Sequence, residues 1–528
     1  MARKKVGEEA RCVLTLPLYP EPYQLDVMEK RFRIFEELKR SLFYVELRKL
    51  KNLERTRAYR ELQQQIRDEY KKQDSQSAKK LKALNARRNE MLKEAGLYQY
   101  RFQEDIKPMR AHFETHVYSS MAIAMADDVW KAFEKYLHGS GRQVHGVRRG
   151  SLSSVSGKGQ WHEDKQSQAL LGLDYRDGKL IWSGGGKKYR PDKDGQPGKR
   201  KDTREKKHTL EIRVAEPRTE YEREMLKKRI CYCRIVRKWM KTRYKYYVQF
   251  VLDGNAYAKE RVPVPGRVGI DIGPQSAAIV SENRAMLVEL AERVDANDKK
   301  LHECQRRMDA SRRSMNPENF RADGTVKSRR FRWKNSRHYL KLAGQARELQ
   351  RKNADIRRYA HYCLANEVLR MGSEVYVENM DFRALQKRSK KTEKNEKGRF
   401  KRKKRFGKSL ANKAPAMFLT ILDNKLKSLC GTELHRVDTW SYRASQYDHL
   451  SRQYTKKALG ERKRVLANGD RLQRDLYSAF LIMNADEERK SVDQQRCDKS
   501  YERFKELHDR EIERIQNDGK KHLSSFGI

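Results

Sequence analysis

The sequence is poor in the residues that mark exported, membrane-spanning and zinc-bound proteins. Its 528 residues include seven cysteines, and no two of them form a Cys-x-x-Cys pair. A structural zinc ribbon needs four ligands in two close pairs, so the sequence predicts no zinc. The odd number and scattered positions of the cysteines predict reduced thiols in an intracellular protein. No apolar run approaches the length of a membrane helix. The first five residues lead into a charged segment rather than the apolar stretch of a secretory signal.

Positive charge is what the chain has in excess. Lysine and arginine number 120 against 72 aspartates and glutamates, a net charge of +48, while hydrophobic residues make up 37%. This composition predicts about two to four domains with modest cores, and surplus charge on surfaces and in grooves. A field this positive predicts a polyanionic partner, for which nucleic acid is favoured. We expect no membrane partner, because no helix sets Trp, Phe or Leu opposite Lys and Arg.

The periodicity of apolar residues predicts an α+β protein of several domains. Residues 1–21 contain a leading strand, and residues 22–140 repeat apolar positions three and four apart, as helices do. Residues 141–262 alternate short apolar runs with Gly- and Ser-rich turns, which predicts a small β-barrel. After Pro263 and Pro265, the second half mixes strands with long charged helices.

Three acidic residues in this second half stand where a strand ends or a helix begins. Asp271 lies in the run Val-Gly-Ile-Asp-Ile-Gly, Glu378 closes Glu-Val-Tyr-Val-Glu, and Asp475 opens the helical segment that continues to Leu481. Neighbouring acids are about a hundred residues apart in sequence, so only a fold can bring them together. Three carboxylates gathered at strand ends suit a pair of Mg²⁺ ions, and paired metals suit phosphodiester cleavage.

Each acid also has an ordinary structural interpretation. Asp271 could cap a turn, and Glu378 could end its strand in solvent. Asp475 could be the N-cap of the helix that follows it. Asp470, five residues earlier, is an alternative third metal ligand.

The order of these elements resembles a known nuclease family. A strand with Asp, a hairpin, a helix, a strand with Glu and a helix with Asp is the order of a ribonuclease H-like nuclease. The islands around Asp271, Glu378 and Asp475 resemble the RuvC domain of the TnpB and type V CRISPR effector superfamily. Two further stretches, 405–417 and 440–446, are similar to segments that these proteins carry between their second and third acids.

The resemblance implies a layout for the whole chain. It consists of a first wedge-domain strand (1–21), a helical recognition lobe (22–140), a β-barrel wedge domain (141–262), a ribonuclease H-like RuvC nuclease domain (263–437), a target nucleic-acid-binding insertion (438–470), and the third acid motif with a charged helical tail (471–528). Family members usually carry Cys-x-x-Cys pairs in the insertion. Here it has no cysteine, so we expect it to be zinc-free.

The resemblance also implies a function. We expect an RNA-guided DNA endonuclease with one RuvC site, in which Asp271, Glu378 and Asp475 hold two Mg²⁺ ions. Its partners would be a guide RNA and target double-stranded DNA, read by guide pairing and a flanking motif. The expected location is the prokaryotic cytoplasm. The alternatives are an RNA-guided repressor that does not cut, a ribonuclease H-like transposase, and a structural RNA-binding protein.

Basic residues between the second and third acids are the candidates for contacting nucleic acid. The densest run, residues 386–409, predicts a phosphate-contacting loop near the active site. Arg330-Phe331-Arg332-Trp333 could stack bases or pack in a core. The candidate contacts are Lys387, Arg388, Lys390, Lys391, Lys401, Arg402, Lys403, Lys404, Arg405, Lys408, Arg443 and Arg474.

Overall fold

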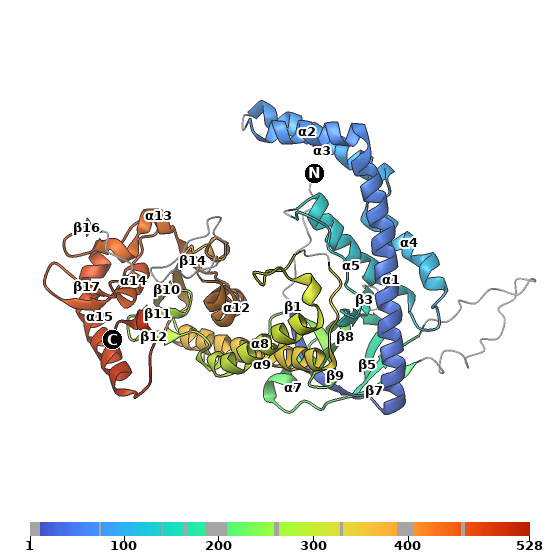
Figure 1. Cartoon of the computed structure of the whole chain (residues 1–528). Coiled ribbons are helices and arrows are strands. Elements are labelled where there is room, and N and C mark those ends of the chain that lie inside the picture. The colour runs from blue at the N-terminus through green and yellow to red at the C-terminus, as the bar shows by residue number, and fades with distance from the viewer. Residues whose placement is uncertain are drawn as a thin grey trace, which may run out of the picture. The chain divides into compact units, whose positions relative to one another are not determined.

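The chain forms two compact units, Met1–Tyr257 and Ala258–Ile528, in a computed structural model (Figure 1). No helix among the residues described is both long and apolar enough to cross a membrane. The structure describes residues 11–72, 75–139, 141–162, 167–184, 209–257, 263–327, 331–387, 406–455 and 460–528.

The first unit begins with a strand and continues into a group of helices. Helix α1 starts at a capping box, in which Glu21 and Gln24 bond each other's backbone, and Pro22 occupies the first helical turn. Its apolar residues recur on one face and bury Phe32, Phe35 and others against the sheet of this unit. The helices are α1 (Pro22–Arg55), α2 (Arg57–Tyr70), α3 (Ser75–Glu94), α4 (Gln99–Ala111), α5 (Ser119–Leu137) and the short α7 (Glu220–Leu226).

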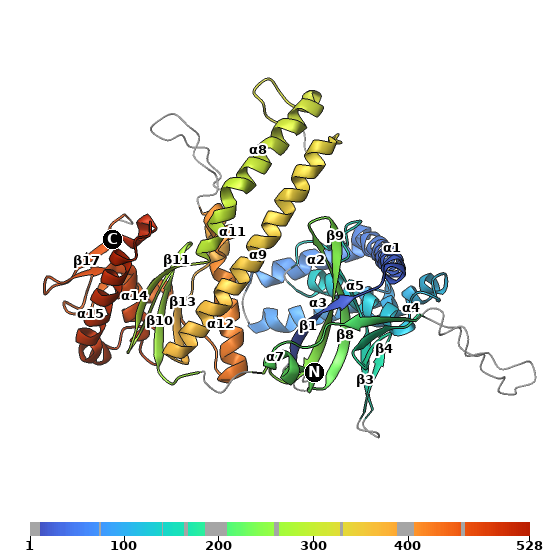
Figure 2. The same ribbon diagram turned by 90° about the horizontal axis from the view of Figure 1, so that it is seen from below.

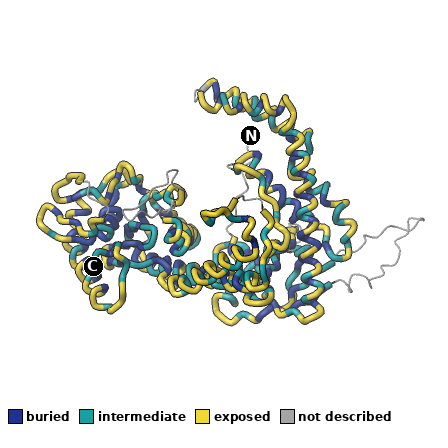
Figure 3. The backbone as a smooth tube through the Cα atoms, viewed as in Figure 1, coloured by how far each residue is buried: buried dark blue, intermediate teal, exposed yellow. Residues whose placement is uncertain are grey.

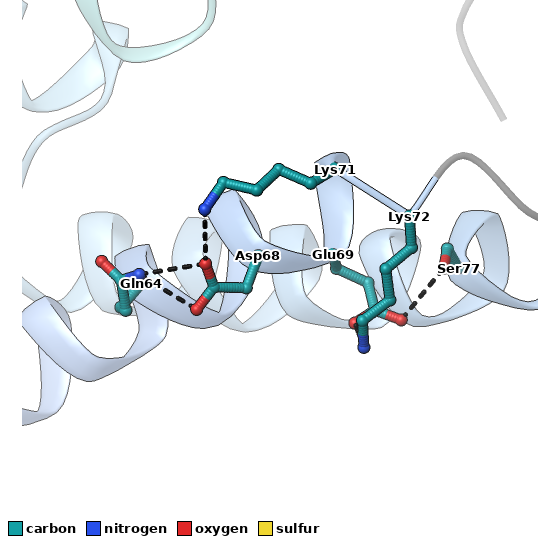
Figure 4. Close-up of polar contacts among 6 residues, drawn as sticks. All are labelled: Gln64, Asp68, Glu69, Lys71, Lys72 and Ser77. Carbon is teal, nitrogen blue, oxygen red and sulfur yellow. Dashed lines mark hydrogen bonds and ion pairs between the residues drawn. The ribbon is translucent and has the colours of Figure 1, made fainter.

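Local polar contacts mark the junction of α2 and α3 (Figure 4). Asp68 accepts hydrogen bonds from Gln64 at 3.0 Å and from Lys71 at 3.1 Å, and the Ser77 hydroxyl donates to Glu69 at 3.2 Å. Because these contacts are local and mostly exposed, each adds little to stability. They stabilise the ends of α2 and α3 slightly, whereas the fold depends on the apolar core.

A seven-stranded antiparallel sheet forms the core of the first unit. Its order is β2-β8-β9-β1-β7-β6-β5. Strand β1 pairs with β9 along Arg11–Pro17 and with β7 at Leu18 and Tyr19, so it joins the two halves of the sheet. Among the described residues the edge strands β2 and β5 do not pair with each other, so the sheet does not close fully into the predicted barrel. The strands are β1 (Arg11–Tyr19), β2 (Ser154–Ser156), β5 (Leu173–Arg176), β6 (Lys179–Trp182), β7 (Leu210–Val214), β8 (Ile230–Met240) and β9 (Arg243–Asp253), with a separate hairpin of β3 (Lys158–His162) and β4 (Ser167–Leu171).

A five-stranded mixed sheet forms the core of the second unit. Its order is β12-β11-β10-β13-β14; β10, β11 and β12 are antiparallel neighbours, whereas β13 runs parallel to both β10 and β14. A parallel neighbour needs a crossover, which the helices between β12 and β13 supply. The strands are β10 (Arg267–Ile272), β11 (Ser276–Ser281), β12 (Ala285–Glu289), β13 (Glu374–Glu378) and β14 (His435–Val437).

Helices cover both faces of this second sheet (Figure 2). Helices α9 (Arg337–Met371) and α12 (Pro415–Leu429) pack on the face that carries Ile270 and Val377. Helices α14 (Arg474–Met483) and α15 (Gln494–Asn517) pack on the opposite face, which carries Ala278 and Tyr376. Because strand side chains alternate between faces, each strand contributes to both cores.

The remaining elements lie around this sheet. Helix α8 (Asp298–Met315) pairs with α9 to form a long helical hairpin (Figure 2). Short helices α10 (Phe382–Leu385), α11 (Gly407–Lys413) and α13 (Thr439–Tyr442) lie between the main elements. The expected zinc-free insertion contains two small hairpins, β15 (Tyr447–Asp448) with β16 (Gln453–Tyr454), and β17 (Lys463–Val465) with β18 (Arg471–Gln473). The second hairpin crosses residue 470, where the sequence places the end of the insertion.

Close contact between α14 and β10 requires a residue without a side chain. A Cβ atom added at Gly269 would stand 2.0 Å from the carbonyl oxygen of Ala479 and 2.4 Å from the backbone nitrogen of Met483. Backbone atoms cannot move aside as a flexible side chain can, so the strand position has to be glycine for the helix to approach so closely.

We therefore predict that Gly269→Ala destabilises the second unit by about 1–3 kcal/mol or more, because the added methyl group overpacks the contact. Urea denaturation of the full chain, followed by circular dichroism, measures the effect. Gly344→Ala is the matched control: its Cβ meets nothing within 4 Å in α9, and alanine there should stabilise the helix by about 0.5–1 kcal/mol. Equal midpoints for Gly269→Ala and the wild type would contradict the close packing.

Candidate active site at the strand ends of the second sheet

Asp271 and Glu378 lie side by side on neighbouring strands. Strands β10 and β13 are parallel, and their register pairs Ile270 with Val377, so the next residue on each strand is one of the two acids. Asp271 is also opposite Ala278, which belongs to the core under α14. Glu378 is opposite Val437 of the same core. Both acids therefore point to the face that α14 covers.

Asp475 reaches these two acids from α14. It occupies the first turn of that helix, one turn before Ala479, whose backbone meets Gly269 of β10. The N-cap of α14 is Gln473, whose side chain accepts the backbone N–H of Leu476 at 2.7 Å. Asp475 is thus not the N-cap, which removes one ordinary role that the sequence leaves open for it.

The three carboxylates influence one another electrostatically. Burial raises the pKa of Asp271 well above its ordinary value, and the charges of Asp475 and Glu378 raise this pKa further. Burial raises the pKa of Glu378 to about 7. Acids that face one another without compensating charge disfavour ionisation, and they form a natural binding place for a cation.

Arg474 supplies the positive charge nearest to this group. Its Nε and Nη2 atoms donate to Asp475 Oδ1 at 3.2 Å each, and its charge lowers the pKa of Asp271. Its Nη1 donates to the carbonyl oxygen of Glu461 at 3.0 Å, and its backbone N–H donates to that of Arg462 at 2.9 Å. Arg474, a candidate nucleic-acid contact, therefore also connects an acid of the site to the β17–β18 region.

The carboxylates face one another but are not drawn tightly together. Among the described residues, no three His, Cys, Asp or Glu side chains are grouped closely enough to hold one metal ion. The donor set nevertheless fits Mg²⁺, because it consists of carboxylate oxygens whose mutual repulsion a hard cation would relieve. Arg474 engages only Oδ1 of Asp475, so the second oxygen of this carboxylate would serve as the ligand.

Ser478 is a residue of this site that the sequence does not single out. Its side chain is buried, and its hydroxyl lies close enough to lower the pKa of Asp271. No hydrogen bond of ordinary geometry forms to it in this structure. Its only signal in the sequence is its position three residues after Asp475, which places both on one side of the helix.

Asp470, the alternative third ligand, has a structural role. It accepts hydrogen bonds from Tyr501 Oη and Lys505 Nζ, each at 2.6 Å, and from Asn468 at 2.6 Å. Hydrogen bonds from Lys505 and Tyr501 lower the pKa of Asp470 to about 2. With both oxygens engaged, Asp470 ties the β17–β18 hairpin to α15 and has no free oxygen to offer a metal.

Buried polar groups hold the cysteine-free insertion together. Arg464 donates to the carbonyl oxygens of Ser445 and Gln446 at 3.2 and 3.0 Å. The ring of His449 is buried, and its Nδ1 is 2.7 Å from the hydroxyl of Tyr477 on α14. These contacts join β17 to the segment just before β15, and the β15–β16 turn to α14.

The predicted nucleic-acid contacts divide into three groups. Lys387 is exposed and Arg443 lies over the ring of Tyr454 at 4.5 Å with its side chain exposed. Lys408 is only half exposed and pairs with Asp298 at 2.8 Å, so it fastens α11 to α8. Arg388, Lys390, Lys391, Lys401, Arg402, Lys403, Lys404 and Arg405 lie outside the described residues.

Comparison with known proteins adds a structural likeness. No protein-family model and no curated protein matches the sequence. A Cas12f1–sgRNA–target DNA complex matches with a TM-score of 0.42 and 14% identity, over 90% of this chain and 99% of that one. A CRISPR–Cas12f ternary complex matches with a TM-score of 0.25 and 14% identity, over 88% and 82%. Both structures align with most of this chain, and the roles assigned to its residues rest on its own geometry.

The raised pKa of Glu378 predicts how stability changes with pH. Between about pH 4.5 and 7 the folded state keeps a proton on Glu378 that the unfolded chain has released. Stability therefore falls as pH rises through this window. We expect Glu378→Gln to remove part of this loss and to gain about 1–3 kcal/mol over the wild type at pH 8 relative to pH 5.

Urea denaturation at the two pH values measures this difference. Glu374→Gln is the matched control, because Glu374 lies on the same strand with its side chain 54% exposed. A pH dependence that is the same in Glu378→Gln, Glu374→Gln and the wild type would show that burial does not disfavour the charge of Glu378.

Proposed function

We propose that the chain is an RNA-guided DNA endonuclease with a single RuvC-type active site. The observation that carries this proposal is the meeting of Asp271, Glu378 and Asp475 on one face of the second sheet. The elements occur in the order expected of a ribonuclease H-like nuclease: β10, the β11–β12 hairpin, helices, β13 and α14. A sheet with a purely structural role would need neither this order of strands and helices nor three acidic residues gathered on one face.

Asp271, Glu378 and Asp475 would hold the metal ions of this site. Two bound Mg²⁺ ions would activate water and stabilise the leaving oxygen of a phosphodiester. Asp271, on the central strand and within electrostatic reach of both other acids, is the best placed to serve both ions. A rotation of the buried Ser478 hydroxyl would let it donate a hydrogen bond to the Asp271 carboxylate beside it. A rearrangement of the Arg474 side chain would bring its guanidinium to the negatively charged phosphate.

The proposed partners are a guide RNA and target double-stranded DNA. The net charge of +48 supports a polyanionic partner. The matched Cas12f1 structure contains an sgRNA and a target DNA, and we extend these two partners to this chain. Guide pairing would read the sequence, while the protein would hold the duplex by its shape and phosphates.

An RNA-guided repressor that binds without cutting is the second candidate. It is favoured by one observation, the loose grouping of the acids with Asp475 held by Arg474. All three acids are nevertheless present and repel one another in a buried place, a cost that a protein without catalysis would have no reason to keep. The transposase would gather three acids too, but its third acid is usually Glu, whereas this chain has Asp475. The structural RNA-binding protein leaves the gathered acids without an explanation.

Cleavage by variants of the three acids tests the proposal. The wild type, purified with the RNA that accompanies it, should cut a DNA matching that RNA in Mg²⁺ and not in EDTA. Asp271→Asn, Glu378→Gln and Asp475→Asn should each lower the rate at least about a hundredfold, because each removes a metal ligand. Target affinity should change less than about threefold, since these side chains do not hold the duplex.

Asp470→Asn is the matched control for Asp475→Asn. It removes an equal charge from the same region, but its partners Tyr501 and Lys505 lie on α15. It should lower stability and leave the cleavage rate of the folded protein unchanged. Normal cutting by Asp475→Asn, together with its loss in Asp470→Asn, would assign the third ligand to Asp470. Guided target binding by the wild type without any cutting in Mg²⁺ would favour the repressor.

A further inference from the structure

The end of the α8–α9 hairpin is a structured part of the second unit that the proposed active site does not use. We define the hairpin tip as residues 312–327 and 331–341. Helix α8 has 18 residues and none of them is buried, which shows that it supports no core (Figure 3). Asn297, at the start of α8, bonds Asn353 of α9 at 2.7 Å. The tip therefore begins about 22 Å farther out along α8.

Arginine–aromatic stacking builds the tip from within. The Arg312 guanidinium lies over the rings of Trp333 and Tyr339, at 5.0 and 4.7 Å from their centres. That of Arg313 lies over the ring of Phe320 at 4.6 Å. The rings of Phe320 and Trp333 are themselves 5.6 Å apart. Such stacks hold side chains in fixed positions at a small entropic cost.

Asn316 closes the tip across its base. It is fully buried, and its side-chain amide donates to the carbonyl oxygens of Arg312 and Lys334 at 2.9 Å each. Its Oδ1 accepts the backbone N–H of Lys334 at 2.7 Å. A buried amide with both ends satisfied fixes one arrangement of the two chain segments. The tip is thus a rigid platform although it lies far from the sheet.

The surface of this platform combines positive charge with exposed apolar groups. The residues of the tip include eight Lys and Arg against two Asp and Glu. Phe331 is 40% exposed. Three other apolar residues of the tip are also exposed: Met315, Val326 and Leu340. Of the aromatic residues noted in the sequence, Trp333 is used for internal packing whereas Phe331 remains available.

We propose that the hairpin tip binds unpaired nucleotides of the RNA partner, with Phe331 stacking on a base and Lys327 and Arg332 contacting phosphates. Aromatic rings among cations are the surface that single-stranded RNA prefers. The inference rests on the proposed function for the presence of an RNA. The strand being cut must reach the acids, whereas a tip one helix length away can hold a part of the RNA that is not paired with the target.

Other occupants fit the tip less well. A second copy of the tip would bring two strongly positive surfaces together, which opposes association. An anionic membrane would be expected to take up Trp and adjacent apolar residues as a continuous patch, but Trp333 is packed against Phe320 and Arg312. Of these occupants, RNA uses both the cations and the exposed ring.

Binding of the RNA recovered with the wild type, transcribed and labelled, tests the surface. Phe331→Ala should weaken it roughly five- to hundredfold with an unchanged salt slope, and Phe331→Trp should restore it. Lys327→Glu with Arg332→Glu should weaken binding and lower the salt slope by about two units. Leu340→Ala, which removes an exposed apolar group without a ring, should have no effect. Circular dichroism confirms that each variant folds.

Lys352→Glu with Arg358→Glu is the matched charge control, since both residues are exposed on the shaft of α9. An equal loss of RNA affinity in this control would show that the tip contributes only nonspecific electrostatic attraction, and would overturn the proposal. So would binding of the tip to phosphatidylserine vesicles with unchanged RNA affinity, or a loss confined to target DNA. Ultraviolet crosslinking of the wild-type complex should join the tip peptide to RNA.

The two proposals fail in different ways. A wild-type preparation that cuts DNA under RNA guidance, but whose tip neither crosslinks to RNA nor affects its affinity, contradicts the tip alone. A preparation whose tip variants lose RNA affinity, but which never cuts a matching DNA, contradicts the endonuclease and leaves the tip as an RNA-binding surface.

Discussion

The contact of α14 with β10 at Gly269 is the constraint on which the rest of the second unit depends. Without a side chain on the strand, the backbone of the helix comes directly against the sheet. This depth of packing brings Asp475 within electrostatic reach of Asp271 and Glu378. The chain thus uses an ordinary packing device, a glycine under a helix, to assemble three charges that would otherwise stay apart.

The gathered acids oppose the fold that gathers them. Burial raises the pKa of both Asp271 and Glu378, so their charged forms weaken the folded state at neutral pH. Arg474 offsets part of this repulsion through Asp475, and it is anchored by Glu461 and Arg462 in the neighbouring hairpin. The repulsion among the buried carboxylates therefore remains only partly compensated, and a bound divalent cation would relieve it. Functional sites often keep such unfavourable interactions at a cost in stability.

Local patterns in the sequence reveal the strands and the helix that carry the three acids, but not the tertiary contacts that hold these elements in place. The strands that carry Asp271 and Glu378 near their ends are visible in the sequence as apolar runs, because both faces of the sheet are covered. The cap of α14 is Gln473 rather than Asp475, and only the structure shows it. The ties of Asp470 to residues of α15 and the place of Ser478 beside Asp271 depend on tertiary contacts that carry no local signal.

Counting the metal ions bound at the acids tests the central claim most directly. Electron paramagnetic resonance of Mn²⁺ added to the complex with RNA and uncut target DNA reports bound ions independently of cleavage. A two-metal site predicts about two coupled ions per chain in the wild type. Asp271→Asn should abolish the coupled signal while leaving RNA and DNA bound. An unchanged count in Asp271→Asn, or DNA cutting without any bound ion, would contradict the assignment of these acids.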